Sequence, residues 1–190
     1  MIDAAVRILG AEGPGSVTVR RLAAEAGVAP MSIYNHFGDM HGVFDAVFRR
    51  GFAEFADALG ESVASDDPLV TLQDMGRRYR SFALDNPDTY AVMFLRVVPG
   101  FEPSEDSDLV AASAFGALAA VVTRAIDTGQ FISADPAIIA QQIWSTCHGA
   151  VALELLGLSK FADPAATYSD LMTTIIRGLL RHPAGSAADA

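Results

Sequence analysis

The apolar residues of this chain recur at the spacing of helices along most of its length. In the first segment Ile2, Val6 and Leu9 fall on one helical face, and Gly13-Pro14-Gly15 ends the pattern. Apolar positions three or four residues apart indicate an amphipathic helix, whereas strict alternation would indicate a strand. Capping residues, prolines and glycines separate the segments, and no convincing strand pattern lies between them. The pattern therefore predicts an all-α fold of about nine helices.

The predicted helices are punctuated by capping residues or proline at the start and by glycine or a polar loop at the end. We expect them at 2–11, 18–26, 30–38, 41–63, 68–85, 87–98, 108–128, 136–158 and 164–181. The last residues, PAGSAADA at 183–190, are small and polar, and we expect a flexible tail there.

Composition and charge divide the chain into two parts. The 190 residues are 51% hydrophobic and 19% charged, which is typical of a globular protein and allows one large domain or two small ones. The net charge is −10, but residues 1–50 contain five basic and five acidic side chains, so the whole excess lies in residues 51–190. This asymmetry indicates two roles, and the N-terminal part is the one that could approach nucleic acid.

The two short helices expected at 18–26 and 30–38 are joined by a tight turn at Gly27, as in a helix-turn-helix. The inward positions, such as Leu22 and Ile33, are apolar. A helix core would not contain Tyr34, Asn35 and His36 in a row. The cluster is explained if the second helix faces DNA, where donors and acceptors are needed. The alternative is an ordinary surface helix end.

These residues also carry a resemblance to a known family. The stretch VTVRRLAAEAGVAPMSIYNHFGDM resembles the DNA-binding motif of the TetR family of transcriptional regulators, and the likeness covers residues 2–47. Further on, YRSFALDNPDTYAVMF and WSTCHG resemble the ligand-binding part of the branch named for its Trp-His-Gly residues. Trp144, His148 and Gly149 are those residues here.

The resemblance implies a role for each matching residue of the motif. Thr18, Tyr34 and His36 would donate hydrogen bonds to DNA phosphates. The residues that would lie against base edges or the nearby backbone are Arg20, Pro30, Met31, Ser32 and Asn35. An asparagine pairs well with adenine, and a thioether can rest on the thymine methyl group, but neither pairing is specific enough to predict an operator.

Three departures from the family pattern are expected to weaken DNA affinity rather than the fold. Met40 stands where the family usually has a lysine that contacts phosphate. Ala29 stands where the family often has a capping serine, although Pro30 lacks one of the amides that a cap would serve. A basic arm normally precedes the first helix, and it is either missing from this sequence or does not exist.

The resemblance implies a one-component regulator, with a DNA-binding domain at 1–45, a helical effector-binding and dimerisation domain at 46–182 and the tail at 183–190. It would be a repressor that binds a palindromic operator as a homodimer and is released by a small-molecule effector. The last two predicted helices are the expected dimer interface, because their Ala, Gly and Leu faces have no other obvious partner. The alternative is a helical homodimer that has lost operator binding and acts by protein contacts or ligand sequestration.

The effector is expected to be largely apolar, but its binding residues are not distinguishable from core residues by sequence. Trp144 and His148 lie four residues apart, so they are neighbours on one helical face, and either a structural or a ligand-binding role fits them. The candidates for the effector site are Phe82, Tyr90, Phe94, Phe115, Trp144 and His148.

Other functions find little support in the residues. Ser145, Cys147, His148 and Glu154 would share one helix, where a nucleophile has no turn or oxyanion hole, so we expect no enzyme and no catalytic residue. We expect no metal and no cofactor, and Asp66-Asp67 and Glu105-Asp106 are interpreted as solvated helix caps. The single Cys147 favours a reducing cytoplasm and a core position. We expect no membrane partner, because the longest uncharged stretch, 136–153, contains several polar residues.

Overall fold

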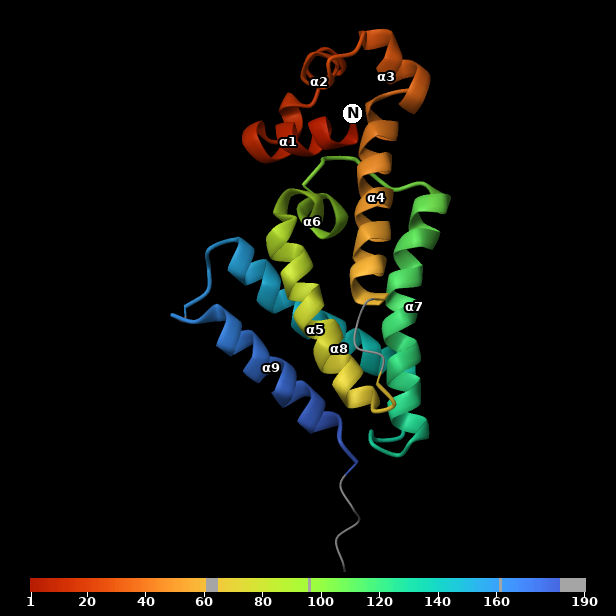
Figure 1. Cartoon of the computed structure of the whole chain (residues 1–190), viewed down its shortest axis with the longest axis vertical. Helices are drawn as coiled ribbons and strands as arrows, with labels where there is room; N and C mark the ends of the chain where they lie inside the picture. The colour runs from red at the N-terminus through yellow and green to blue at the C-terminus, as the bar shows by residue number, and fades with distance from the viewer. Residues whose placement is uncertain (61–64, 96, 161, 182–190) are drawn as a thin grey trace, which may run out of the picture. The chain divides into compact units, whose positions relative to one another are not determined.

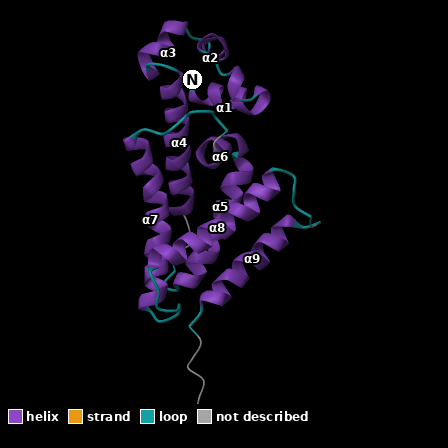
Figure 2. Cartoon of the chain, turned by 180° about the vertical axis from the view of Figure 1, so that it is seen from behind, coloured by secondary structure: helices purple, strands orange, loops and turns teal. Residues whose placement is uncertain are grey.

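The structure, a computed structural model, describes residues 1–60, 65–95, 97–160 and 162–181. Within these ranges the chain is all-helical, as predicted (Figures 1 and 2). The helices are α1 (Ile2–Glu12), α2 (Val19–Ala26), α3 (Pro30–Phe37), α4 (Met40–Gly60), α5 (Pro68–Asp85), α6 (Pro87–Phe94), α7 (Glu105–Asp127), α8 (Pro136–Leu155) and α9 (Pro164–Leu179). A 3-10 turn at Pro14–Ser16 and an isolated bridge between Phe131 and Leu180 complete the described secondary structure.

Capping side chains begin several helices at the predicted residues. The Thr18 hydroxyl accepts a hydrogen bond from the Arg21 amide at 3.3 Å, and the Asp135 and Asp163 carboxylates cap α8 and α9 at 2.9 Å. Gly27 ends α2 in the left-handed conformation, with φ of 67°, which a glycine adopts without strain. Caps that are recognisable in the sequence therefore fix where these helices begin and end.

Some helix boundaries differ from the prediction. α7 begins at Glu105 rather than at residue 108, because the Ser104 hydroxyl accepts the Ser107 amide at 3.3 Å and so starts the helix earlier. α6 ends at Phe94 rather than at residue 98. The predicted end of the fourth helix at residue 63 and the predicted tail at 183–190 lie outside the described residues.

The chain divides into two compact units. The first contains residues 1–57 and 85–114, and the second contains residues 58–84 and 115–190. The first unit thus joins α1, α2 and α3 to most of α4, to α6 and to the beginning of α7. This division does not follow the predicted domain boundary between residues 45 and 46, which stays a prediction.

In the first unit, α4 contributes fully buried residues to the apolar core. Val43 and Val47 have no exposed surface, and Ile33 from α3 and Ile8 from α1 are at most 1% exposed. The Asp45 carboxylate ties α4 to the start of α7: it accepts hydrogen bonds from the Ser104 amide at 2.8 Å and from the Ser104 and Ser107 hydroxyls at 2.9 Å. Burial raises the pKa of Asp45, but these hydrogen bonds lower it by more, so its pKa lies below the ordinary value.

In the second unit, α8 packs against α9. The buried Cys147 thiol of α8 lies 3.2 Å from the Met172 thioether of α9. Burial raises the pKa of Cys147 to about 11, because a thiolate is poorly solvated in an apolar environment. Cys147 is therefore the core residue that the sequence predicted, and it is protonated at neutral pH.

Candidate nucleic-acid interface and effector region

The turn between α2 and α3 is held together by backbone geometry and by apolar packing. The Val28 amide donates to the Ala23 carbonyl at 3.0 Å across the turn, next to the left-handed Gly27. Leu22 and Ile33 are fully buried between the helices. The inward positions of the predicted helix-turn-helix are thus the buried ones, and α3 is fixed on a rigid support.

The outward face of α3 carries the side chains that were predicted to meet DNA. Met31 is 63% exposed and Tyr34 is 49% exposed, although both are large and largely apolar. Pro30, Asn35 and His36 are also exposed, whereas Ser32 is half-buried. Large apolar side chains at the surface of a short helix indicate a contact surface rather than a core. The structure places these candidates together on one helix, and their contacts with DNA stay a prediction.

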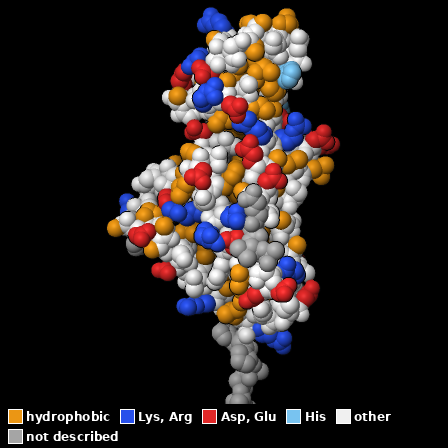
Figure 3. Space-filling model, in the orientation of Figure 1, with side chains coloured by type: hydrophobic (Ala, Val, Ile, Leu, Met, Phe, Trp, Pro, Cys, Tyr) orange, Lys and Arg blue, Asp and Glu red, His pale blue; other side chains and the backbone are white. Residues whose placement is uncertain are grey.

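The positive charges near α2 differ in their availability. Thr18 and Arg20 are exposed at the start of α2, and Arg20 has no ion pair among the residues that the structure describes. Arg21 pairs with Glu12 at 2.8 Å and with Glu25 at 3.1 Å. The hydrogen bonds to these carboxylates raise the pKa of Arg21. Acidic and basic side chains are also interspersed over the surface seen in Figure 3. Arg20 is therefore the cation of α2 that can approach a phosphate without breaking an ion pair.

The structure shows the surroundings of Ala29 and Met40, two of the residues at which this chain departs from the family pattern. Ala29 provides no side-chain cap for α3, and Pro30 occupies its first position. Met40 is half-buried at the start of α4, where the Asp39 carboxylate caps the Gly42 amide at 2.9 Å. Sequence reasoning did not identify His41, which is exposed at this helix start and whose ring lies 5.3 Å from that of Phe101. An exposed histidine beside the reading helix is a further candidate for a phosphate contact.

The six candidates for the effector site fall into two groups. Tyr90 and Phe94 lie in the first unit, with ring centroids 4.8 Å apart, and Phe94 also packs on Phe52 at 5.0 Å. Phe82 is buried in the second unit. There, too, Trp144 lies 6.3 Å from Phe115 and 5.6 Å from His148.

His148 is both packed and hydrogen-bonded. Its Nδ1 lies 3.2 Å from the Tyr79 hydroxyl, and its ring packs on Trp144. Burial lowers the pKa of His148, because the charged imidazolium loses hydration there. The ring is thus neutral at physiological pH and can accept or donate a hydrogen bond at the edge of an aromatic cluster.

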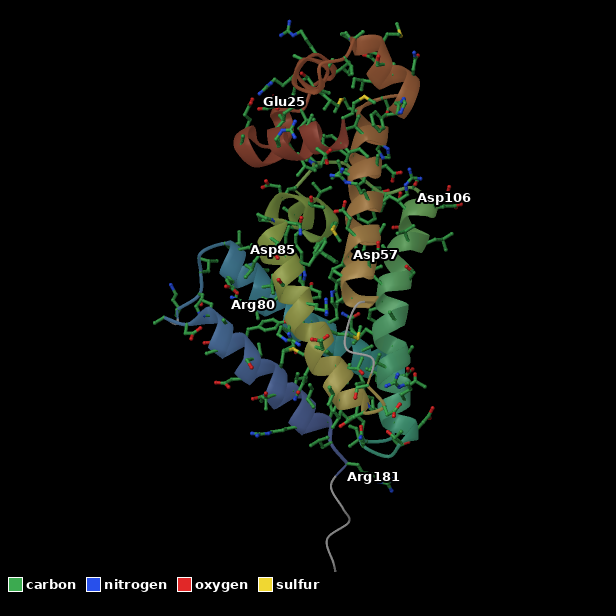
Figure 4. All side chains as sticks on the ribbon, in the orientation of Figure 1. Glu25, Asp57, Arg80, Asp85, Asp106 and Arg181 are labelled. Carbon is green, nitrogen blue, oxygen red and sulfur yellow. The ribbon has the colours of Figure 1, made fainter. Side chains whose placement is uncertain are left out.

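One helix is apolar enough to be compared with a membrane span. Within the described residues α7 alone meets that test by length and composition, with a mean hydropathy of 1.9 in its most apolar window. Helices of soluble proteins meet the same test. The first turn of α7 contains Glu105, Asp106 and Asp108, and Asp106 is labelled in Figure 4. Length and composition are therefore weak evidence of a membrane segment in this chain.

Comparisons with known proteins agree with this arrangement. The family model "Bacterial regulatory proteins, tetR family" matches residues 1–47, and the model "Tetracyclin repressor-like, C-terminal domain" matches residues 72–175. The chain is 28% identical over 184 residues to an uncharacterized HTH-type transcriptional regulator, Rv0681, of Mycobacterium tuberculosis, covering 95% of this chain and 80% of the relative.

Solved structures have the same fold. A protein with unknown function from Rhodococcus sp. RHA1 has a TM-score of 0.84 and 26% identity, with 95% of this chain and 93% of that chain covered. The TetR family regulator PfmR of Thermus thermophilus has a TM-score of 0.74 and 17% identity, covering 95% of this chain and 98% of that chain. Membership of the Trp-His-Gly branch stays a prediction. A helix-turn-helix at the N-terminus and a helical C-terminal part, each matched by its own model, show that this chain belongs to the TetR family of transcriptional regulators.

Proposed function

We propose that this TetR-family regulator is a cytoplasmic repressor that binds a palindromic operator as a homodimer and leaves it when a small-molecule effector binds. The proposed DNA-binding domain is residues 1–45, and the proposed effector-binding and dimerisation domain is residues 46–182. The observation that carries the proposal is the exposed outer face of α3 on a packed α2–α3 support.

The exposed side chains of α3 and α2 support two kinds of contact with DNA, one with phosphates and one with bases. The Tyr34 hydroxyl and the His36 ring are exposed donors suited to phosphate oxygens, as is the Thr18 hydroxyl at the start of α2. Asn35, on the exposed face between Tyr34 and His36, offers a paired donor and acceptor that suits adenine. Arg20 supplies a positive charge, while Met31 offers an apolar contact. Phosphate contacts would set the register and the Asn35 side chain would read sequence.

A homodimer is supported by an exposed, uncharged face of α8 that has an apolar residue at each end. The exposed residues Ile138, Gln142, Ser145, Gly149 and Leu153 recur at intervals of three or four, so they lie on one face. Ile138 is 58% exposed and Leu153 is 51% exposed, which leaves apolar surface for a second copy to bury. On α9, Leu171 is 38% exposed. Two copies of α8 and α9 would form a four-helix bundle.

The proposed effector region is the aromatic group around Trp144 and His148 in the second unit, with Phe82 as a further proposed binding residue. The other two candidates, Tyr90 and Phe94, lie in the first unit, and their role stays a prediction. A ligand that displaced the Tyr79 hydroxyl from His148 would rearrange α5 and α8 together, because the two side chains join those helices. Such a ligand shifts the population only if it prefers the conformation that binds DNA badly.

Selection of duplexes from a random pool, followed by fluorescence anisotropy, tests the proposed function. We expect an inverted repeat with half-sites about one helical turn, ~34–36 Å, apart. Light scattering on the same preparation should give the mass of a dimer. Failure to enrich any sequence while the protein is a folded dimer would contradict the repressor role.

The second candidate function, a homodimer without operator binding, is favoured by the charges around α2. Arg21 is paired with two carboxylates, and Met40 cannot replace a phosphate-binding lysine. A selection without enrichment, together with a ligand-dependent change in thermal stability, would favour this function instead. The two functions are thus separated by one DNA measurement and one ligand measurement.

A further inference from the structure

The second unit contains a cavity that none of the effector candidates lines. It lies between α5 and α9 and has a volume of about 470 Å³. The α5 wall carries charged and amide groups, including Gln73, Arg77 and Arg80. The α9 wall carries hydroxyl groups, including Ser169 and Thr173. A volume of this size is within the range of small-molecule sites.

A buried carboxylate organises the α5 wall. The Asp74 side chain is only 3% exposed, and it forms ion pairs with Arg77 and with Arg78, the latter at 3.0 Å between Nε and Oδ2. A buried carboxylate is stable only when it is paired and hydrogen-bonded. Asp74 therefore holds both arginines in place without exposing its own charge.

Arg77 is the group that a ligand would meet first. Its side chain is 74% exposed, although one of its nitrogens pairs with Asp74. A guanidinium has five N–H donors in a rigid fork, so a single ion pair uses only part of its capacity. Arg77 thus presents an oriented positive group at the cavity.

Arg80 completes the charged wall and is itself fixed. Its Nε and Nη2 donate to the two Glu154 oxygens of α8 at 2.9 and 2.5 Å, and the Arg80 and Glu154 side chains are 21% and 17% exposed. Arg80 is labelled in Figure 4. Of the two arginines in the described lining, Arg80 is neutralised by Glu154, whereas Arg77 shares the Asp74 carboxylate with Arg78. Arg77 is therefore the lining cation whose charge is only partly compensated, in a chain whose net charge is −10.

Beside the cavity, two contacts at Gly76 hold α9 close to α5. The Tyr168 hydroxyl donates to the Gly76 carbonyl at 2.7 Å, and a Cβ atom at Gly76 would lie only 2.8 Å from the Met172 methyl group. The helices therefore meet tightly at Gly76 and leave the cavity on the side of Arg77 and Ser169. Val70 and Met172 add apolar surface to the lining.

We propose that this cavity binds a small aliphatic carboxylate. The carboxylate would accept a bidentate hydrogen bond from Arg77, which suits the geometry of that fork. Ser169 and Gln73 would hydrogen-bond the remaining oxygen lone pairs, and the short apolar chain would lie against Val70 and Met172. The site is distinct from the aromatic effector region, and it does not depend on DNA binding.

Titration with sodium hexanoate at constant ionic strength, followed by thermal unfolding and calorimetry, tests the proposal. We expect hexanoate to raise the Tm in a saturable way. 1-Hexanol and inorganic phosphate should have much smaller effects, because 1-hexanol lacks the carboxylate and phosphate lacks the apolar chain. Equal protection by 1-hexanol, equal protection by phosphate, or no saturable effect of hexanoate would each overturn the proposal.

Two serine-to-glutamate variants give a matched comparison that leaves the Asp74 ion pairs intact. Ser169→Glu places a negative charge in the cavity lining, and Ser113→Glu places one at an exposed position of α7, outside the lining and outside the proposed dimer interface. We expect Ser169→Glu to abolish hexanoate binding and Ser113→Glu to keep it. Equal binding by the two variants would show that the ligand lies elsewhere.

Arg77→Gln tests the charged wall directly. We expect hexanoate affinity to fall about tenfold or more, as for loss of a charge-assisted hydrogen bond. Arg177→Gln, at an exposed position of α9 outside the lining, is the control for loss of one positive charge. If both variants bound hexanoate equally well, Arg77 would not be the carboxylate-binding group.

Discussion

Replacing Gly42 by alanine should displace the DNA-reading helix from its support. Gly42 lies in the first turn of α4, close to the short link from α3. A Cβ atom built there would lie 1.9 Å from the Phe37 carbonyl oxygen and 3.0 Å from its carbonyl carbon. The obstacle is backbone, which cannot rotate away as a side chain can, so α3 or α4 must move.

The size of the effect follows from two opposing terms. Overpacking of this kind costs typically about 1–3 kcal/mol, and occasionally more. Alanine stabilises a helix relative to glycine by about 1 kcal/mol. Because a backbone atom at 1.9 Å places the cost at the upper end of that range or above, we expect Gly42→Ala to lower the free energy of unfolding by about 2 kcal/mol or more. It should also weaken binding to every DNA sequence, because the whole of α3 shifts.

Gly116→Ala is the matched control. Gly116 is an exposed residue of α7, and a Cβ atom there would meet no heavy atom within 4 Å. The same substitution should stabilise the protein by about 1 kcal/mol at this position. Urea unfolding of both variants, with anisotropy on the selected operator, measures the difference. Equal stability and equal operator affinity in the two variants would refute the argument from the Phe37 carbonyl.

Further expectations concern DNA recognition and pH. Tyr34→Phe should weaken binding to all sequences about equally, whereas Asn35→Ala should change preference at one base pair by about 1–3 kcal/mol in a repeated selection; an unchanged preferred sequence would exclude base reading by Asn35. The slope of log K against log salt should be shallow, about −3 to −5 for the dimer, because few unpaired cations lie near α3 and each neutralised phosphate contributes about −0.9; a slope near −8 would show that other cations reach the backbone. Stability should fall as pH drops below the ordinary histidine pKa of 6.5, because the unfolded chain takes up a proton that His148 resists when folded; a His148→Phe variant with the same pH profile would contradict this. Asp45→Asn should lower stability by about 1–2 kcal/mol near neutral pH relative to Asp57→Asn, and the difference should disappear in acid as the lowered pKa of Asp45 is passed.

The parts of the fold that depend on local signals could be predicted from the sequence. Thr18, Gly27 and Asp135 act within a few residues of themselves, so caps and turns alone were enough to locate α2 and α8. The helix-turn-helix is equally local, because its two helices are joined by a short turn. The pairing of Arg21 with Glu25 has the spacing of four residues that favours a helical ion pair.

Contacts between distant segments could not be predicted in this way. A Cβ atom at Gly10 of α1 would lie 2.0 Å from the Asp88 carboxylate of α6, yet nothing in either segment identifies the other as its partner. The effector candidates were chosen as aromatic residues, and aromatic character does not tell whether a ring lies with Phe52 or with Trp144. The cavity beside Arg77 arises because two helices far apart in the sequence diverge, which no single-segment pattern records.

The buried thiol of Cys147 also makes the protein convenient for site-specific labelling. Thiolates react with maleimide dyes, and a thiol with a pKa of about 11 in a closed core offers very little thiolate at neutral pH. The native chain should therefore remain unlabelled while folded, without removal of its one cysteine. An Ala24→Cys variant, at an exposed position of α2, would carry a single dye per chain. Energy transfer between two such dyes in a dimer would measure the distance between the two α2 helices, with and without a ligand.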